Sequence, residues 1–411
     1  MELSLSKKSY LGVDLGTSAI KIVELQNKSG RAMLVTYGYV EQSTDIVRAS
    51  SDEMEERIVG ILKSICKKSR VTSKKVVAAL PSFSVFTSII SLPAMKKKDI
   101  GQAIGWEAKK FVPLPIEDMI LDWKIINPAA KKNNKPKQPQ SVVKFNSTVL
   151  DNYNSRYGFD QKSRNEDVSN YMEEKHGFIS RFFRKDKNQT SADREEDKHT
   201  GNLSVLLTAA PKTLVERYLR IFKRAELEII SLETEAFALE RSLAGGDTAP
   251  MMIIDIGSIS SDITIINGGI PILNRSIDVG GVTITKSLMS SLNVDITRAE
   301  QFKRDIGFSS LSGESLPAII KNTINPIINE VKYSLDIYLS QADKNNIEKI
   351  VLTGGSAWLP ELPKYLSKLL NTRVIIGDPW DRIIYPMDLK PILNELGPRF
   401  SIAIGLAMRE L

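Results

Sequence analysis

Two stretches of the chain share one pattern of apolar and polar positions. In residues 12–25 and again in residues 252–266, an apolar run ends in an Asp-x-Gly turn and a second apolar run follows. Short apolar runs on either side of a glycine turn are typical of paired β-strands. Because the two turns lie 241 residues apart, the pattern predicts two related halves, each built on a strand, an acidic glycine turn and a second strand.

The rest of the chain alternates between helix and strand patterns, which predicts a duplicated α/β arrangement with a cleft between its halves. The expected helices cover residues 51–68, 99–111, 212–224, 235–243, 283–292, 297–305, 316–342, 362–370 and 400–411. The expected strands outside the two glycine-turn pairs cover residues 33–41, 75–80, 85–92, 203–209 and 349–353.

Local signals refine three of these helices. Asp99 is the expected N-cap of the second helix, and Thr297 with Glu300 three residues later has the pattern of a capping box. Pro326 lies inside the long segment 316–342, where a proline predicts a break or a kink.

Composition narrows the class of protein. The chain has 411 residues, a formal net charge of +7 and a single cysteine, Cys66, so it has no internal disulfide and no thiolate zinc site. Its lysines are scattered, which speaks against nucleic-acid binding. His176 and His199 are the only histidines, so a histidine-based triad or metal site is not expected. No apolar run is long enough to span a bilayer and residues 1–9 lack a signal-peptide region, so a cytoplasmic protein is expected.

The two glycine turns carry the residue types that hold phosphate. Gly16 and Gly257 would allow positive φ and would turn successive N–H groups toward an anion. Hydroxyl groups next to them add further donors. These are Thr17, Ser18, Ser258 and Ser260. Taken alone, an Asp-x-Gly turn is more often only a hairpin, so the prediction depends on the two turns acting together.

The acidic residues of these turns predict a metal ion. Asp14 and Asp255 would repel a polyphosphate unless Mg²⁺ lay between them, bound directly or through water. Lys21, on the outgoing run of the first turn, is placed to reach a terminal phosphate.

Three later features predict contacts to the base and the sugar. Gly354, Gly355 and Ser356 follow an apolar run, and the absence of side chains at the glycines would let a flat base lie against the backbone. A helix from about residue 359 would direct its positive end toward the cleft. Two further pairs complete the expected site. Gly280 and Gly281 offer a similar approach before a helix, and Glu300 and Lys303 share a helix face that could bind ribose hydroxyls.

In their order along the chain, the strand–DLGT–strand, DIGS and TGGS motifs resemble the phosphate-1, phosphate-2 and adenosine motifs of the actin-like ATPases. Within that superfamily the chain is similar to the family of type IV pilus assembly protein PilM. The similar stretches are residues 12–25, 76–93, 104–115, 206–238, 333–341, 350–359 and 396–409. The most specific of them is residues 105–115, with Trp-Glu-Ala, an aromatic residue and Val-Pro-x-Pro.

The resemblance implies the actin-like ATPase fold, with two related halves around a nucleotide cleft and a small extra α+β subdomain in the first half. The expected first large subdomain comprises residues 1–82 and 208–244. The small extra subdomain comprises residues 83–207 and contains a polar, mobile insertion at about 127–200. The second half comprises residues 245–411, with a smaller inserted subdomain at about 280–335.

The resemblance also implies a function. Members are cytoplasmic ATP-binding adaptors at the inner face of the inner membrane, so ATP and Mg²⁺ are the expected ligands, with at most slow ATPase activity. The expected partners are the cytoplasmic N-terminal peptide of a PilN-like membrane protein and other pilus assembly proteins. Trp106 and Phe111 are candidates for the peptide groove. Glu235 lies where hydrolysing members place a carboxylate that orients the attacking water.

Alternatives remain open at this point. A small-molecule kinase of the same superfamily would need a base for a substrate hydroxyl, and the chain has no further motif for one. A filament-forming, FtsA-like cell-division protein would be expected to carry a terminal amphipathic membrane helix, and no such helix is expected before the end of this sequence at Leu411. Residues 178–185, from Phe178 to Lys185, place apolar residues beside basic ones and could touch an anionic membrane surface or form part of a linker.

Overall fold

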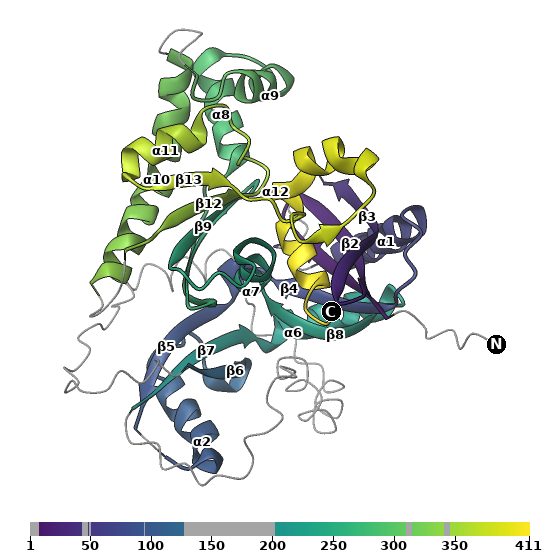
Figure 1. Ribbon diagram of the computed structural model, residues 1–411, viewed down its shortest axis with the longest axis vertical. Coiled ribbons are helices and arrows are strands. Elements are labelled where there is room, and N and C mark those ends of the chain that lie inside the picture. The colour runs from purple at the N-terminus through teal and green to yellow at the C-terminus, as the bar shows by residue number, and fades with distance from the viewer. Residues whose placement is uncertain are drawn as a thin grey trace. The chain divides into compact units, whose positions relative to one another are not determined.

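The computed structural model describes residues 8–42, 48, 51–93, 95–126, 202–309, 315–340 and 346–411 (Figure 1). The chain divides into two compact units, Met1–Ser84 with Tyr218–Leu411, and Val85–Arg217. The polar stretch 127–200, including both histidines and the candidate membrane segment 178–185, lies outside the described residues.

The first sheet of the larger unit has six strands in the order β14-β3-β2-β1-β4-β8. β1, β2 and β3 form an antiparallel meander, and β4 and β8 run parallel to β1 on its other side. Their bounds are β1 Ser9–Leu15, β2 Ala19–Lys28, β3 Arg31–Glu41, β4 Lys75–Leu80, β8 Glu228–Thr234 and β14 Ile383–Ile384. The first acidic glycine turn joins β1 to β2.

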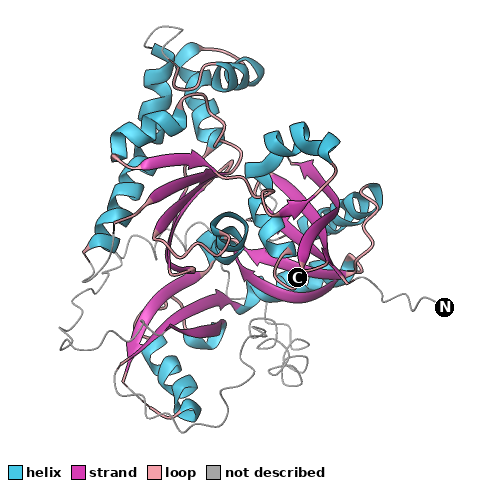
Figure 2. Cartoon of the chain, viewed as in Figure 1, coloured by secondary structure: helices cyan, strands magenta, loops and turns pink. Residues whose placement is uncertain are grey.

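The second sheet repeats this topology with the order β11-β10-β9-β12-β13 (Figure 2). β9, β10 and β11 form the antiparallel meander, and β12 and β13 are the parallel strands. Their bounds are β9 Met251–Ile256, β10 Ser261–Asn267, β11 Ile270–Ile277, β12 Lys349–Thr353 and β13 Arg373–Ile376. The prediction of two related halves, drawn from the two glycine turns, therefore matches the strand order.

Helices pack against both sheets. Their bounds are α1 Asp52–Lys68, α6 Lys212–Arg224, α7 Glu235–Leu239, α8 Gly281–Leu292, α9 Ile296–Asp305, α10 Ser315–Leu339, α11 Leu362–Leu370 and α12 Lys390–Ala407. α1 shows why such segments fold locally, because the Ser51 side chain accepts a hydrogen bond from the amide of Met54 and acidic residues occupy its first turn.

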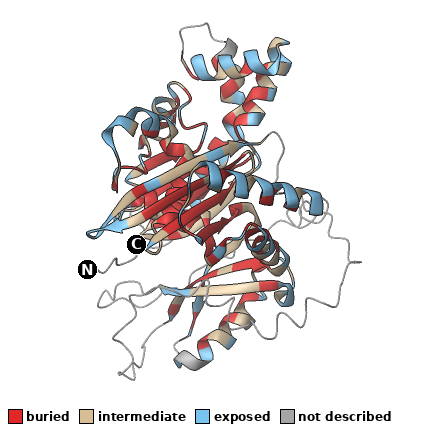
Figure 3. Ribbon diagram, turned by 90° about the vertical axis from the view of Figure 1, so that its right-hand side faces the viewer, coloured by how far each residue is buried: buried red, intermediate tan, exposed pale blue. Residues whose placement is uncertain are grey.

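One hydrophobic core joins the two sheets. Val77 and Ala79 of β4 share it with Met251 and Ile253 of β9 and with Ile402 of α12. Buried residues, red in Figure 3, are concentrated in the central strands of this unit. The two sheets are therefore parts of one packed body and not separate domains on a linker.

Helix α12 lies unusually close to the first sheet. A Cβ atom on Gly12 would lie 2.0 Å from the carbonyl oxygen of Ala403, and one on Gly405 would lie 1.9 Å from that of Ala238. Only glycine allows such backbone contact. These two positions fix α12 against β1 and α7, so the residues of α12 that face the cleft are held in place.

In its described residues, the smaller unit contains a three-stranded sheet, β5-β7-β6, and the helix α2. The bounds are β5 Phe86–Leu92, β6 Met119–Ile126, β7 Leu203–Pro211 and α2 Lys97–Ala108. Ile100, Ile104 and Ala108 of α2 recur at helical spacing and pack into the core of the sheet with Val205 and Leu207.

Three expectations about helix ends are wrong. α2 begins at Lys97 with Lys96 as its N-cap, so Asp99 lies inside the first turn. α9 is capped by Asp295, which accepts from the amide of Arg298, so Thr297 and Glu300 form no capping box. α12 begins at Lys390, ten residues before the expected start at Phe400, because Pro391 occupies its tolerated first turn and Pro398 does not end it.

Two further helices differ from the pattern. α10 is continuous through Pro326 where a break or a kink was expected. α7 is an α-helix only over Glu235–Leu239 and continues as a π-helix over Glu240–Ala244. Among the described helices, none has the length and apolar character needed to cross a bilayer.

Candidate functional site

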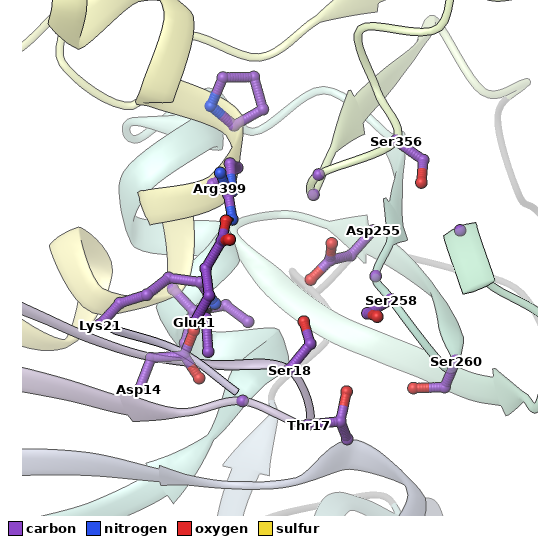
Figure 4. Close-up of a pocket in the computed structure, with 18 of the residues that line it drawn as sticks. Asp14, Thr17, Ser18, Lys21, Glu41, Asp255, Ser258, Ser260, Ser356 and Arg399 are labelled. Atoms are coloured by element: carbon purple, nitrogen blue, oxygen red, sulfur yellow. Dashed lines mark hydrogen bonds and ion pairs between the residues drawn. The ribbon is translucent and has the colours of Figure 1, made fainter. Parts of the chain in front are cut away.

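A pocket of about 820 Å³ lies within the larger unit. Both Asp-x-Gly turns, the loop after β12, helix α9 and helix α12 contribute to its walls. Figure 4 shows Asp14, Thr17, Ser18 and Lys21 on one side and Asp255, Ser258, Ser260 and Ser356 on the other. Of the residues predicted for nucleotide binding, the pocket brings together every one except Gly280, which lies directly before the lining residue Gly281.

The two turns are copies of one geometry. The amide of Gly16 donates to the carbonyl of Ala19 at 3.0 Å, and the amide of Gly257 donates to that of Ser260 at 3.0 Å. A Cβ atom on either glycine would lie 2.9 Å from that same carbonyl oxygen. The expected positive φ is wrong, since neither glycine has it. Glycine is required here by the tightness of the turn.

Each turn leaves amide groups for a ligand. Among the described residues, the amides of Thr17, Ser18, Ser258 and Ile259 donate to no backbone carbonyl. Successive free N–H groups in a tight turn form a concave site that favours anions. The chemistry of both turns therefore suits phosphate oxygens.

Asp14 is held by a lysine. It is buried, and its Oδ2 accepts a hydrogen bond from Lys21 Nζ at 2.7 Å. The two residues lie directly opposite each other in the β1–β2 ladder. Lys21 therefore neutralises Asp14 in this structure, and its side chain would have to change partner to reach a phosphate.

Asp255 has a different neighbour. Directly opposite it in the β9–β10 ladder lies a second acid, Asp262, which the sequence analysis missed. Burial raises the pKa of Asp255 to about 6, with Lys21 lowering it and Asp14 raising it. Burial and the charge of Asp255 raise the pKa of Asp262 to about 7. Asp262 Oδ1 is buried and has no hydrogen-bond partner among the described residues.

Glu235 faces the same acids from the start of α7. Its Oε2 accepts a hydrogen bond from the amide of Ser82 at 2.7 Å. Burial, then the charges of Asp262 and Asp14, hold the pKa of Glu235 well above its usual value, although the Ser82 bond opposes this. The part of the pocket between the two turns thus gathers the carboxyl groups of Asp14, Glu235, Asp255 and Asp262 near Lys21, an arrangement that a bound cation would relieve.

A metal ion of the Mg²⁺ type fits this arrangement only with help from other ligands. Within the described ranges, no group of three or more acidic, histidine or cysteine side chains is placed to hold a metal. Mg²⁺ usually keeps several waters and needs one or two carboxylates together with phosphate oxygens. Asp255 and the unpartnered oxygen of Asp262 meet that need better than Asp14, which Lys21 already holds.

The loop after β12 leaves its backbone open at one of its two glycines. Gly354 has φ +86°, and a Cβ there would lie 2.2 Å from Asp255 Oδ1, whereas a Cβ on Gly355 would meet nothing within 4 Å. Gly355 is exposed in the pocket wall and Ser356 is buried beside it. α11 has the bounds expected for it, Leu362–Leu370, so its positive end lies about three residues after the start near 359 that was expected for it at the cleft.

The glycines before α8 do not offer their amides. Gly281 donates to the carbonyl of Gly257 at 2.9 Å, and Val282 donates to that of Ser258 at 2.8 Å. A Cβ on Gly280 would lie 2.6 Å from the Ser258 carbonyl oxygen. Gly280 and Gly281 therefore brace the second turn and leave no amide for a ligand.

Glu300 and Lys303 face the pocket as a bonded pair. Lys303 Nζ donates to Glu300 Oε1 at 2.6 Å and to Thr285 Oγ1 at 2.8 Å. Burial lowers the pKa of Lys303, and this is opposed by Glu300. The pair belongs to the pocket wall, as predicted, and presents a carboxylate and an ammonium on one side.

Further lining residues were missed in addition to Asp262, and four of them matter for the site. Trp358 is 49% exposed at the pocket wall although it is a large aromatic residue. Tyr39 and Glu41 of β3 and Arg399 of α12 line the first-half side. Trp358 lies in the quoted stretch 350–359, two residues after the TGGS motif, and could have been noticed. The other three residues reach the pocket only through the packing of β3 and α12.

The two groove candidates of the smaller unit differ in exposure. Trp106 is 66% exposed on α2, with Lys109 Nζ 5.4 Å from its ring centroid. Phe111 is partly buried and packs against the hydrophobic core of that unit. Trp106 is therefore the more exposed of the two candidates, and Phe111 also contributes to packing.

Similarity to known proteins agrees with this fold. A family model described as type IV pilus assembly protein PilM matches residues 12–143 and 192–411. Among solved structures, a PilM–PilN type IV pilus biogenesis complex has a TM-score of 0.70 at 22% identity, covering 97% of this chain and 98% of that one. The ethanolamine utilization protein EutJ of Carboxydothermus hydrogenoformans has a TM-score of 0.51 at 14% identity, with 98% and 90% covered.

Curated relatives match this chain over only part of its length. The cell division protein FtsA of Bacillus subtilis (strain 168) is 25% identical over 194 residues, which is 42% of this chain and 44% of that protein. FtsA of Neisseria meningitidis serogroup B is 24% identical over 225 residues, with 49% and 52% covered. The chain thus spans about half the length of the curated relatives it matches.

The repeated five-strand topology and these structural likenesses confirm the expected actin-like ATPase fold. The family model covers most of the chain, on both sides of the gap between residues 143 and 192. The chain belongs to the family of type IV pilus assembly protein PilM.

Proposed function

We propose that this chain is an ATP-binding adaptor of the type IV pilus assembly machinery. In this role Mg²⁺ and ATP would occupy the pocket between the two Asp-x-Gly turns, and the closed form of the protein would present a surface that partners bind. A ligand changes such an equilibrium only through its different affinity for the two forms.

The duplicated hairpin carries the nucleotide proposal. Two copies of one turn, each with unused amides and a buried acid, face a single pocket from the two sheets. In this arrangement Thr17, Ser18, Ser258 and Ser260 would bind phosphate oxygens. Asp255 and Asp262 would hold the water shell of Mg²⁺, with Asp14 and Lys21 beside them.

The opposite end of the pocket suits a nucleoside. The bare backbone of Gly355 and the exposed ring of Trp358 offer two flat surfaces for a base. Glu300 and Lys303 would bind the ribose hydroxyls. Gly354, Ser356 and Gly281 would shape the wall without contacting the ligand through their amides.

We assign Glu235 the place of a water-orienting carboxylate. It lies in the pocket with Asp14 and Asp262 as charged neighbours. Its raised pKa favours the protonated form, and a protonated acid is a poor acceptor for a water proton. This supports slow turnover, in keeping with an adaptor.

The partner proposal rests on the family. The similar solved structure is a complex of PilM with PilN, so we propose a PilN-like membrane protein as partner, bound through its cytoplasmic N-terminal peptide. Such a partner would bring this chain to the inner face of the inner membrane. Other pilus assembly proteins would join the same complex.

A filament-forming division protein is the less favoured alternative. The FtsA matches cover less than half of this chain in each case, whereas the PilM family model covers most of it. A small-molecule kinase is also less favoured, because the chain carries no further motif for a base dedicated to an acceptor hydroxyl.

A peptide-binding measurement tests the adaptor proposal. The synthetic N-terminal peptide of a PilN-like protein, labelled with a fluorophore, is titrated with the full chain while anisotropy is followed, with and without Mg-ATP. The proposal predicts saturable binding whose affinity depends on Mg-ATP, together with little ATP turnover. Rapid ATP consumption that requires a small acceptor, without peptide binding, would favour the kinase instead.

A further inference from the structure

One ion pair joins strand β3 to helix α12 at the wall of the pocket. Arg399 Nη2 donates to Glu41 Oε1 at 2.6 Å, and the Arg399 guanidinium lies 5.3 Å from the ring centroid of Tyr39. All three residues line the pocket. Figure 4 shows the side chains of Arg399 and Glu41 meeting there.

The cations of the pocket differ in how firmly they are held. Lys21 is 16% exposed and bonded to the buried Asp14, and Lys303 is 12% exposed and bonded to Glu300 and Thr285. Arg399 is 30% exposed, and its partner Glu41 is 64% exposed. An ion pair with one partner in water is weak, because solvent screens it and two long side chains must be ordered. Arg304 of α9 also lines the pocket and is 78% exposed, 3.9 Å from Glu300 Oε2 on the second-half side. On the first-half side, where Lys21 is bonded to a buried acid, Arg399 is the cation that can change partner more readily.

The backbone next to Arg399 cannot move as easily. The carbonyl of Pro398 accepts hydrogen bonds from the amide of Gly354 at 3.0 Å and from Thr353 Oγ1 at 2.9 Å. Gly354 in turn lies against Asp255. The pocket wall is thus tied to α12 at Pro398, one residue before Arg399. A change at Arg399 would be a rotation of the side chain and not a shift of the helix.

We propose that Arg399 is a phosphate-binding residue whose guanidinium exchanges between Glu41 and a nucleotide phosphate. A nucleotide phosphate would compete with Glu41 for the guanidinium, and charge-assisted bonds of arginine to phosphate are among the stronger ones. This inference rests on the proposed function, since it assumes a nucleotide in the pocket. The proposal adds Arg399 of α12 to the site. It also makes the charge at the end of β3 depend on whether a nucleotide is bound in the pocket.

The consequence for Glu41 follows from its place. It is the last residue of β3, and the next amide, of Gln42, donates to the carbonyl of Ser18 in the first turn. When Arg399 binds phosphate, Glu41 becomes an unpaired acid at the surface. Occupancy of the pocket would thereby alter the outer edge of the first sheet.

A double-mutant cycle tests the proposal. Calorimetric affinities for Mg-ATP are measured for the full chain and for R399Q, E41Q and the double variant. We expect R399Q to weaken binding about 10-fold or more, as loss of a charged hydrogen bond does. We expect E41Q to strengthen binding, because the competitor is removed, and to have no effect in the R399Q background.

The controls separate this exchange from general electrostatics. Asp388, just before α12, and Lys390, at its start, are exposed and lie outside the lining of this pocket, so D388N and K390Q change the net charge as E41Q and R399Q do. Both should leave the affinity nearly unchanged. If E41Q strengthens binding equally with and without Arg399, the proposed exchange of Arg399 between Glu41 and phosphate is wrong. The effect of E41Q would then come from the net charge alone.

Adenosine, which has no phosphate, gives the second readout. R399Q should bind adenosine as the unchanged chain does, and an equal loss for adenosine and Mg-ATP would overturn the phosphate assignment. If the unchanged chain binds Mg-ATP and R399Q binds it equally well, only this inference fails. If the unchanged chain binds no nucleotide, the proposed function fails and this inference fails with it.

Discussion

Lys21 and Asp262 occupy the same position in two copies of one hairpin. Lys21 lies opposite Asp14 in the β1–β2 ladder, and Asp262 lies opposite Asp255 in the β9–β10 ladder. Each residue of the second hairpin has the number of its counterpart plus 241. Asp14 is thus neutralised by its cross-strand partner Lys21, whereas Asp255 is repelled by its cross-strand partner Asp262. This difference makes the second hairpin the side that gains from a cation.

The first prediction follows from that asymmetry. Asp255→Asn should weaken Mg-ATP binding about 10-fold or more, because a charged ligand of the metal's water shell is lost. Binding of ATP without Mg²⁺ should change little or improve, since a negative charge is removed. Isothermal titration with and without Mg²⁺ measures both. Asp247→Asn is the matched control, because Asp247 is an acid of the second half that pairs with Lys349 outside this pocket.

The second prediction concerns pH. The pKa values of Asp255, about 6, and Asp262, about 7, lie above the value of about 4 in an unfolded chain. Between those limits the folded state holds more protons than the unfolded state, so the free energy of unfolding should fall as pH rises from about 4 to about 7. Thermal melts of the ligand-free chain across this range should show it, and Asp262→Asn should flatten the slope. A slope that Asp262→Asn leaves unchanged would mean that other groups cause it.

The same pKa shifts also lead to a prediction about ligand binding. A cation binds the ionised carboxylates, so protons compete with it. Affinity for Mg-ATP should therefore rise with pH through the window near 6 to 7, in the direction opposite to the stability of the ligand-free chain. Titrations at three pH values across that window check it.

The third prediction compares two neighbouring glycines. Gly354→Ala places a methyl group at φ +86° and 2.2 Å from Asp255 Oδ1, so we expect a loss of about 2–4 kcal/mol in the free energy of unfolding. Gly355→Ala meets no atom within 4 Å and should change stability by no more than about 0.5 kcal/mol. Urea denaturation measures both. If Gly355→Ala keeps its stability but binds ATP more weakly, the methyl group marks where the base lies.

The fourth prediction compares two exposed tryptophans. Trp358→Ala should weaken nucleotide binding about 10-fold, within the range of base–aromatic stacking. Trp106→Ala should leave it unchanged, because Trp106 belongs to the smaller unit. The same two variants should behave in the reverse way toward the PilN-type peptide. Tryptophan fluorescence during ATP titration gives a direct readout, since only the signal of Trp358 should respond.

Much of the fold could be predicted because its signals are local. The hairpins around Asp14 and Asp255 are each specified by a few consecutive residues, and the two sheets repeat them faithfully. Asp262 was missed because a single polar residue in a strand has no meaning by itself. A position-by-position comparison of the two hairpins would have placed it opposite Asp255.

Other parts of the site depend on packing that short patterns do not contain. Arg399 reaches the pocket because α12 begins at Lys390 and is held by Gly12 and Gly405 against the first sheet. Asp295 and Thr297 are both good capping residues, and only the structure shows that Asp295 is used. A need for glycine in each turn was predicted from positive φ. In the structure the need is steric, because a Cβ atom would lie too close to a carbonyl oxygen.

A crystal structure of the full chain with Mg²⁺ and a non-hydrolysable ATP analogue tests the central claim most directly. The account predicts triphosphate density between the turns at residues 14–18 and 255–260, with Asp255 and Asp262 facing the metal and the base beside Gly355 and Trp358. Density for the analogue elsewhere, or a pocket in which both acids face away from the metal, would contradict it.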